Sequence, residues 1–162
     1  MIILQKNKHC LNVESFEFKC AFGKNGISKR KKEGDKKTPS GIFEIENLYF
    51  RGDRIKKPIT KLKTIEIKKN MIWCNDVRSR YYNKLCRVNK NVRHEKLFRK
   101  DNKYDLIIPI KYNFKNPIPG KGSCIFLHLS KNYAPTAGCI ALSKNNFLIL
   151  IKLLKKKSKI KI

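Results

Sequence analysis

The sequence has few acidic residues: 12 aspartates and glutamates stand against 39 lysines and arginines, and the formal net charge is +27. Such an excess of positive charge favours anionic partners, such as nucleic acids, acidic membranes or carboxylate-bearing substrates. The lysines are, however, spread along the whole chain rather than gathered in one stripe with interleaved aromatic residues. We therefore interpret most of the charge as compositional bias, and we expect no specific nucleic acid partner.

Long apolar runs and paired metal-binding motifs are also missing. No stretch approaches the ~20 apolar residues of a membrane-spanning helix. The N-terminal apolar run ends at Leu4, short of the roughly 7–15 residues of a signal-peptide core. The six cysteines include no Cys-x-x-Cys pair and no Cys/His cluster with zinc spacing. The sequence thus predicts no transmembrane segment, no visible signal peptide and no metal site. The disulfide state stays open for five cysteines: Cys10, Cys20, Cys74, Cys86 and Cys124.

Alternation of apolar and polar residues predicts a compact, mainly β domain with little helix. The clearest case is 13–22, where Phe16, Phe18, Cys20 and Phe22 fall on one side of an expected strand. Further short strands are expected at 42–50, 63–69, 104–113, 123–130 and 139–143.

Other segments lack this alternation. A basic loop is predicted over 23–41 and irregular chain over 73–91, because glycine, lysine and turn-forming residues replace the periodic pattern. A short helix is expected over 93–100. Pro109 should place the strand expected over 104–113 at a sheet edge or a bulge, because proline has no amide hydrogen to donate.

The C-terminal region is expected to hold the clearest helix. Ser143 can cap it, and apolar residues recur after Ser143 at helical spacing. These residues are Phe147, Leu150, Ile151 and Leu154. We predict one domain over 1–154, since ~100–200 residues per domain is usual. A lysine-rich tail over 155–162 is expected to fray.

The stretch HLSKNYAPTAGCIALS, residues 128–143, holds the strongest chemical signal. His128 and Cys139 should each leave a strand on the face opposite the aliphatic side chains, so neighbouring strands can bring imidazole and thiol together. A thiolate, favoured by the positive field of the protein, can attack a carbonyl, and an imidazole can serve as its base. Gly138 permits close approach, and adjacent amides can stabilise an oxyanion. An inert buried thiol beside an incidental histidine is the alternative that spacing alone leaves open.

This stretch resembles the active-site motif of the YkuD-type L,D-transpeptidase catalytic domain, a histidine followed by Ser/Thr-x-Gly-Cys. Five further blocks of this sequence are similar to blocks of one bacterial branch of that family, and they follow one another in the same order as in that branch. The similarity therefore runs from about Cys20 to about Leu154. The blocks read CAFGKNGISKRKKEGDKKTPSGIFEI, FRGDR, WCNDVRSRYYN, LFRKDNKYDLIIPIKYN and PIPGKGSCIFLH. The resemblance implies a YkuD-like β-sandwich with one or two short helices, including a C-terminal helix.

The resemblance also implies a cysteine peptidyl transferase that acts on acidic peptidoglycan stem peptides. Cys139 would attack the carbonyl of the third stem residue and expel the terminal D-amino acid, with His128 as base and amides near Gly138 as oxyanion hole. An amine would then resolve the thioester into a cross-link, whereas water would make the protein an L,D-carboxypeptidase. No cofactor is needed. The resemblance implies the periplasm or cell envelope, although no signal peptide is visible. We expect a monomer.

The chain departs from the commonest form of the motif at two places. Ala137 stands where a second histidine usually precedes the glycine, and Ala141 and Leu142 replace the usual arginine after the cysteine. The stem carboxylates would then be held by Arg51, Arg99 or a loop lysine. The full set of expected substrate-binding residues is Thr136, Arg51, Trp73, Asp76 and Arg99. A non-catalytic basic protein that binds polyanions is the alternative from another class.

Overall fold

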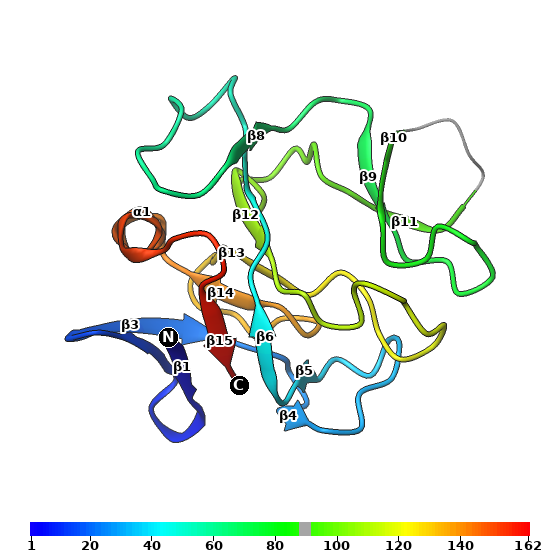
Figure 1. Ribbon diagram of the computed structural model, residues 1–162, viewed down its shortest axis with the longest axis horizontal. Coiled ribbons are helices and arrows are strands. Elements are labelled where there is room, and N and C mark those ends of the chain that lie inside the picture. Colours follow the sequence, from blue (N-terminus) through cyan, green and yellow to red (C-terminus); the bar gives the residue numbers. More distant parts are fainter. Residues whose placement is uncertain (88–91) are drawn as a thin grey trace.

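The computed structural model describes residues 1–87 and 92–162, and most of its regular structure is β-strand (Figure 1). A ten-stranded sheet forms the body of the molecule. Its strands, in the order in which they lie side by side, are β6 (Ile42–Glu44), β15 (Lys159–Lys161), β1 (Ile2–Gln5), β2 (Cys10–Val13), β3 (Phe16–Ala21), β14 (Ile140–Leu142), β13 (Phe126–Leu129), β12 (Leu106–Pro109), β7 (Leu48–Phe50) and β8 (Thr64–Glu66).

Smaller elements flank this sheet. A three-stranded sheet has the order β10 (Leu85–Arg87), β9 (Met71–Cys74) and β11 (His94–Lys96), and β4 (Ile27–Ser28) pairs with β5 (Thr38–Pro39) inside the predicted basic loop. The helices in the described residues are the 3-10 turn η1 (Lys6–Lys8) and α1 (Lys144–Leu153). Figure 1 shows α1 and the three-stranded sheet on opposite sides of β12, β13 and β14.

The predicted C-terminal helix is confirmed. Ser143 caps α1, because its hydroxyl accepts a hydrogen bond from the Asn146 amide at 3.2 Å. Phe147, Leu150 and Ile151 are buried in the main aliphatic core. The helix therefore covers one face of the central strands.

The central strands separate two cores, and their alternation is confirmed. Leu127 and Ile140 enter the main aliphatic core under α1. Phe126 and Cys139 enter a second core on the opposite face, where Phe126 meets Trp73 edge-on at a ring distance of 5.2 Å. Because neighbouring residues of a strand point to opposite faces, the side chains that carry chemistry lie on the second face.

The strand predicted over 13–22 needs correction. The strand expected over 13–22 begins at Phe16, because Val13 ends β2 and a turn through Glu14, with φ of 54°, joins the two strands. Phe16 lies at the end of β3 and is 43% exposed, although it shares a face with buried Phe18.

The prediction of a short helix over 93–100 is wrong. His94–Lys96 form β11, which pairs with β9, and Leu97 is buried. Pairing with a strand distant in sequence overrides the local preference of this segment. Trp73 also lies in a strand rather than in irregular chain, and residues 88–91 of that prediction lie outside the described residues.

Pro109 lies at a bulge, one of the two places predicted for it, and not at a sheet edge, since β12 lies between β13 and β7. Ile107 pairs with Tyr49 and Ile110 with Ile45, so the partner strand has one extra residue opposite this part of β12.

The prediction for the C-terminal tail is wrong because distant strands pair. The tail 155–162 does not fray, because Lys159–Lys161 form β15 between β1 and β6, with Ile160 fully buried. One buried isoleucine between two exposed lysines is the pattern of a strand with one face covered.

Candidate active site

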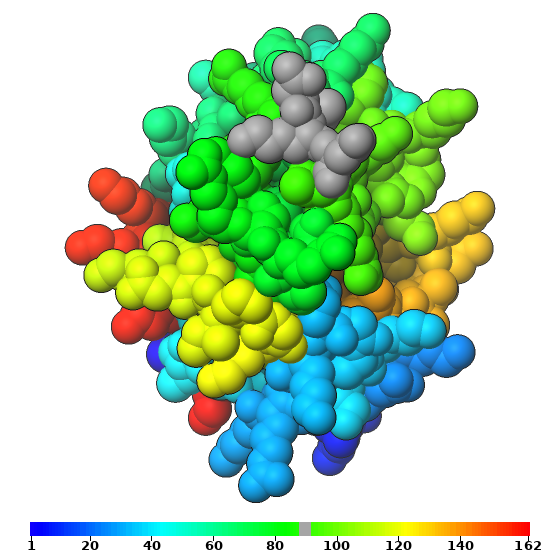
Figure 2. Space-filling model, turned by 90° about the vertical axis from the view of Figure 1, so that its right-hand side faces the viewer, coloured from blue at the N-terminus to red at the C-terminus, as the bar shows by residue number. Residues whose placement is uncertain are grey.

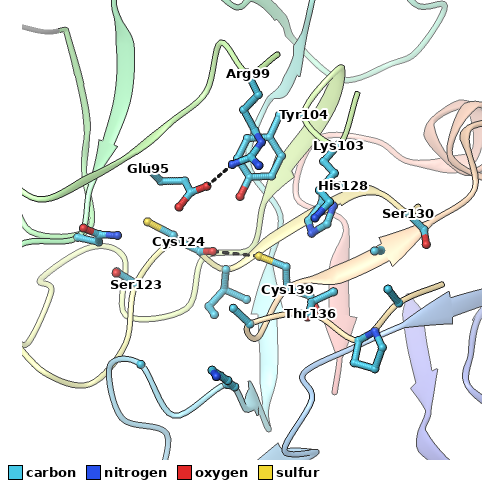
Figure 3. Close-up of a pocket in the computed structure, with 18 of the residues that line it drawn as sticks. Glu95, Arg99, Lys103, Tyr104, Ser123, Cys124, His128, Ser130, Thr136 and Cys139 are labelled. Atoms are coloured by element: carbon cyan, nitrogen blue, oxygen red, sulfur yellow. Dashed lines mark hydrogen bonds and ion pairs between the residues drawn. The ribbon is translucent and has the colours of Figure 1, made fainter. Parts of the chain in front are cut away.

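Two parallel strands place a thiol and an imidazole on the same face of the sheet. β13 and β14 pair in the register Leu127 to Ile140 and His128 to Ala141. Since Leu127 and Ile140 point into the main core, His128 and Cys139 point to the opposite side. Both side chains line the same cleft (Figure 3).

The cleft has a volume of about 590 Å³. Its walls come from the loop 23–41, the three-stranded sheet and the connection between β13 and β14. Figure 2 shows the loop (blue), the segment around 76–84 (green) and the segment around 114–122 (yellow) meeting on one face. Basic side chains dominate the lining: Lys31, Lys36, Arg93, Arg99, Lys103 and Lys131 stand against Glu33 and Glu95. The cleft therefore favours a substrate that carries carboxylates.

His128 is held in one orientation and one tautomer. Its Nδ1 lies 2.8 Å from the Leu129 carbonyl oxygen, which can only accept, so Nδ1 carries the proton and Nε2 keeps its lone pair. The Tyr104 ring packs edge-on against the imidazole at 5.4 Å. Burial, with the positive charges of Lys103 and Arg99, lowers the pKa of His128 to about 4. The imidazole is therefore neutral at physiological pH and can accept a proton.

Cys139 is a neutral thiol in this state. Burial raises its pKa to about 12, although the Phe126 amide, 3.4 Å from Sγ, opposes this by donating to the sulfur. The thiol itself donates to the Cys124 carbonyl oxygen at 3.1 Å (Figure 3). The positive charge of Lys31 favours the thiolate, in the expected direction, but desolvation has the larger effect on the pKa of Cys139.

Thr136 and Gly138 shape the turn before Cys139. The Thr136 hydroxyl donates to the Cys139 carbonyl oxygen at 2.6 Å and accepts from the Gly138 amide at 3.1 Å. Gly138 has φ of 136°, and a Cβ added to it would lie 2.7 Å from the Lys37 carbonyl oxygen. Only glycine fits here, because the conformation and the close backbone both exclude a side chain.

We expect Gly138→Ala to destabilise the fold by about 2–4 kcal/mol, since left-handed strain alone costs ~1–3 kcal/mol and the clash with Lys37 adds to it. Gly120→Ala is the matched control, because Gly120 also has positive φ (81°) but an added Cβ would meet nothing within 4 Å. Chemical denaturation measures both free energies of unfolding. Equal losses in the two variants would contradict the close packing described for Gly138.

Of the expected substrate-binding residues, the structure brings Thr136 and Arg99 to the cleft. Arg51 lies elsewhere and is 2% exposed. Its guanidinium binds the Asp53 carboxylate through two hydrogen bonds of 2.8 Å and donates to the Arg99 carbonyl oxygen at 2.6 Å. Arg51 therefore fixes the segment that carries Arg99.

Trp73 and Asp76 do not line the cleft either. Trp73 is buried in the second core, and its indole donates to Asn83 Oδ1 at 2.9 Å. Asp76 accepts from the Arg78 amide at 3.0 Å, and this hydrogen bond lowers the pKa of its carboxyl. Trp73 therefore has a packing role and Asp76 a turn role.

Several residues of the cleft belong to no sequence motif. Glu33 accepts hydrogen bonds from the Tyr82 hydroxyl and, at 2.8 Å, from the Ser123 hydroxyl, and so ties the loop 23–41 to two distant segments. Tyr104 packs on His128, and Lys103 lies close by (Figure 3). No periodic pattern links these positions, because only the folded chain brings them together.

Within residues 1–87 and 92–162, no group of three or more His, Cys, Asp and Glu side chains is placed to hold a metal ion. The cysteines of this part form no disulfide. None of its helices combines the length and apolar character needed to cross a bilayer.

Comparison with known proteins agrees with the geometry of the cleft. The family model YkuD, described as the L,D-transpeptidase catalytic domain, matches residues 2–162. No curated protein and no solved structure matches the chain. The match covers both strands of the thiol–imidazole pair, the cleft walls and the C-terminal strand, and the mainly β fold is the expected sandwich. The chain belongs to the YkuD family of L,D-transpeptidase catalytic domains.

Proposed function

We propose that the protein is an L,D-transpeptidase that forms cross-links between peptidoglycan stem peptides through a thioester on Cys139. The observation that carries this proposal is the placement of Cys139 and His128 on one face of adjacent parallel strands, at the base of a basic cleft. His128 is oriented by the Leu129 carbonyl, so its free nitrogen is available as a base.

The proposed reaction has two acyl-transfer steps. Cys139 gives its proton to Nε2 of His128, and the sulfur attacks the carbonyl carbon of the third stem residue. Amides near Gly138 and Cys139 stabilise the tetrahedral oxyanion. The C–N bond then breaks, and the imidazolium protonates the departing amine. In the second step an acceptor amine attacks the thioester, His128 takes the amine proton, and the thiol is restored.

Product analysis with a tetrapeptide stem tests the proposal. The intact enzyme should release the terminal D-amino acid and, with an amine acceptor present, yield a cross-linked product. Cys139→Ala should remove both activities while the protein stays folded, and Cys86→Ala, outside the cleft, is the control. Trimmed stems without cross-links would indicate an L,D-carboxypeptidase. If Cys139→Ala released the D-amino acid at an unchanged rate, Cys139 would not be the nucleophile. If the protein had no activity and bound polyanions of any kind, the non-catalytic alternative would be favoured.

A further inference from the structure

One cation in the cleft stands beside His128 without an ion-pair partner. Lys31 is taken by Asp35, with Nζ 2.6 Å from the carboxylate. Arg99 is held by Asp101 at 2.7 Å and by Glu95 at 3.0 Å. Within the described ranges, Lys103 forms no ion pair. Its ammonium is thus free to bind an incoming anion.

The backbone fixes Lys103 next to the imidazole. The Lys103 carbonyl oxygen accepts from the Leu129 amide at 2.9 Å, directly after His128 in β13. Its side chain lines the cleft and lies beside His128 in Figure 3. The charge of Lys103 contributes to the lowered pKa of His128, which is consistent with this proximity.

Asp101 forms no ion pair with Lys103, although the hydrogen bond from Arg99 and, after it, the charge of Lys103 help to lower the pKa of the Asp101 carboxyl. The Lys103 amide donates to Asp101 Oδ1 at 3.3 Å. Both carboxylate oxygens of Asp101 are taken by Arg99, at 2.8 and 2.7 Å. The bidentate pair fixes that carboxylate on the guanidinium, so the ammonium remains available.

The chemistry of acyl transfer places a carboxylate at this position. The leaving nitrogen must lie close to His128, because the imidazolium protonates it. In a C-terminal residue the α-carboxylate is attached to the carbon that carries this nitrogen, so it lies only two covalent bonds away. It therefore falls on the His128 side of the scissile bond, where Lys103 stands.

We infer that Lys103 is a specificity-determining residue whose ammonium binds the free α-carboxylate of the residue that the enzyme expels. This inference rests on the proposed function. It makes the enzyme selective for the C-terminal residue of a stem, because an extended or amidated stem offers no carboxylate at that place. Other cleft lysines, such as Lys131, add to the general positive field without this selectivity.

Binding measured without chemistry tests the inference. In a Cys139→Ala background, calorimetry compares a tetrapeptide stem that has a free C-terminal carboxylate with the same peptide as its C-terminal amide. The carboxylate form should bind about tenfold more tightly or better, as expected for a hydrogen bond between two charged groups. Lys103→Gln should bring the ratio close to one, and Lys103→Arg should retain much of it.

Lys131→Gln is the matched control, because it removes the same charge from the same cleft. A ratio that survives in Lys103→Gln, or that falls equally in Lys131→Gln, would overturn the role of Lys103. Equal binding of both peptides to the Lys103-containing protein would overturn it as well. Thioester formation by the protein with Cys139 intact is recorded separately. If no thioester forms but the carboxylate peptide still binds more tightly than the amide, the proposed function alone is refuted. If neither peptide binds, the proposed function and the role of Lys103 are both refuted.

Discussion

Replacing His128 with glutamine is expected to slow acylation of Cys139 by about 10²–10⁴-fold, the usual contribution of a positioned general base. The reason is that Cys139 rests as a neutral thiol, so the attack on the carbonyl requires a group that takes its proton. Glutamine keeps a polar side chain next to the Leu129 carbonyl but provides no basic nitrogen. Rapid quench followed by mass spectrometry measures the rate of thioester formation.

His94→Gln is the matched control for this experiment. The His94 Nδ1 also lies close to a backbone carbonyl oxygen, that of Val92 at 2.6 Å, but His94 does not line the cleft. Its replacement should leave the acylation rate within about twofold, since surface changes away from a site have small effects. Thermal denaturation shows whether both variants stay folded. An unchanged acylation rate in folded His128→Gln would refute the role of His128 as the general base.

Alkylation of Cys139 by iodoacetamide in the free enzyme is expected to be about 10³-fold slower at pH 7 than alkylation of an exposed thiol with a pKa near ~8.5. Burial raises the pKa of Cys139 to about 12, so the reactive thiolate is rare at neutral pH. The rate should rise about tenfold per pH unit from pH 7 to pH 10, because the thiolate fraction grows in that proportion.

The pH profile separates two resting states of the site. If the alkylation rate reached a plateau near pH 8, Cys139 would ionise at an ordinary or lowered pKa. This would contradict a resting state in which both the Cys139 thiol and the His128 imidazole are neutral. In His128→Gln the slope should stay the same, because the imidazole, with its pKa lowered to about 4, is already neutral over this range. A slope that changes in this variant would show an imidazolium–thiolate pair in the free enzyme.

The local pattern was sufficient to predict the elements that carry the site. Alternation placed Leu127 and Ile140 in one core and His128 and Cys139 on the other face, since the period of a strand is a property of the chain itself. The cap at Ser143 was predicted for the same reason, because its partner, the Asn146 amide, is three residues away.

Strands that form by pairing with distant segments could not be predicted from the local sequence pattern. β11 and β15 became strands because β9, β1 and β6 offer them unpaired backbone groups. In isolation, 93–100 resembles a helix and 155–162 a charged tail. Neither segment contains information about the strand that it joins.

The residues of the candidate site also fall into two groups, those that a local motif predicts and those that only the fold brings together. The motif identified Cys139, His128 and Thr136, which are close in sequence. Arg51 has the right charge for a substrate carboxylate, but its partner Asp53 already takes that charge. The candidate that replaces it, Lys103, is recognisable only because the fold places an unpaired ammonium beside the imidazole.

The central claim is that Cys139 forms a thioester with the substrate, and the mass of the intact protein tests it most directly. After brief incubation with a tetrapeptide stem, the protein should gain the mass of the peptide less its terminal D-amino acid. Peptide mapping should place this adduct on Cys139, and Cys139→Ala should show none. An adduct that persists in Cys139→Ala, or a folded protein that releases the D-amino acid without acylation at Cys139, would contradict the account.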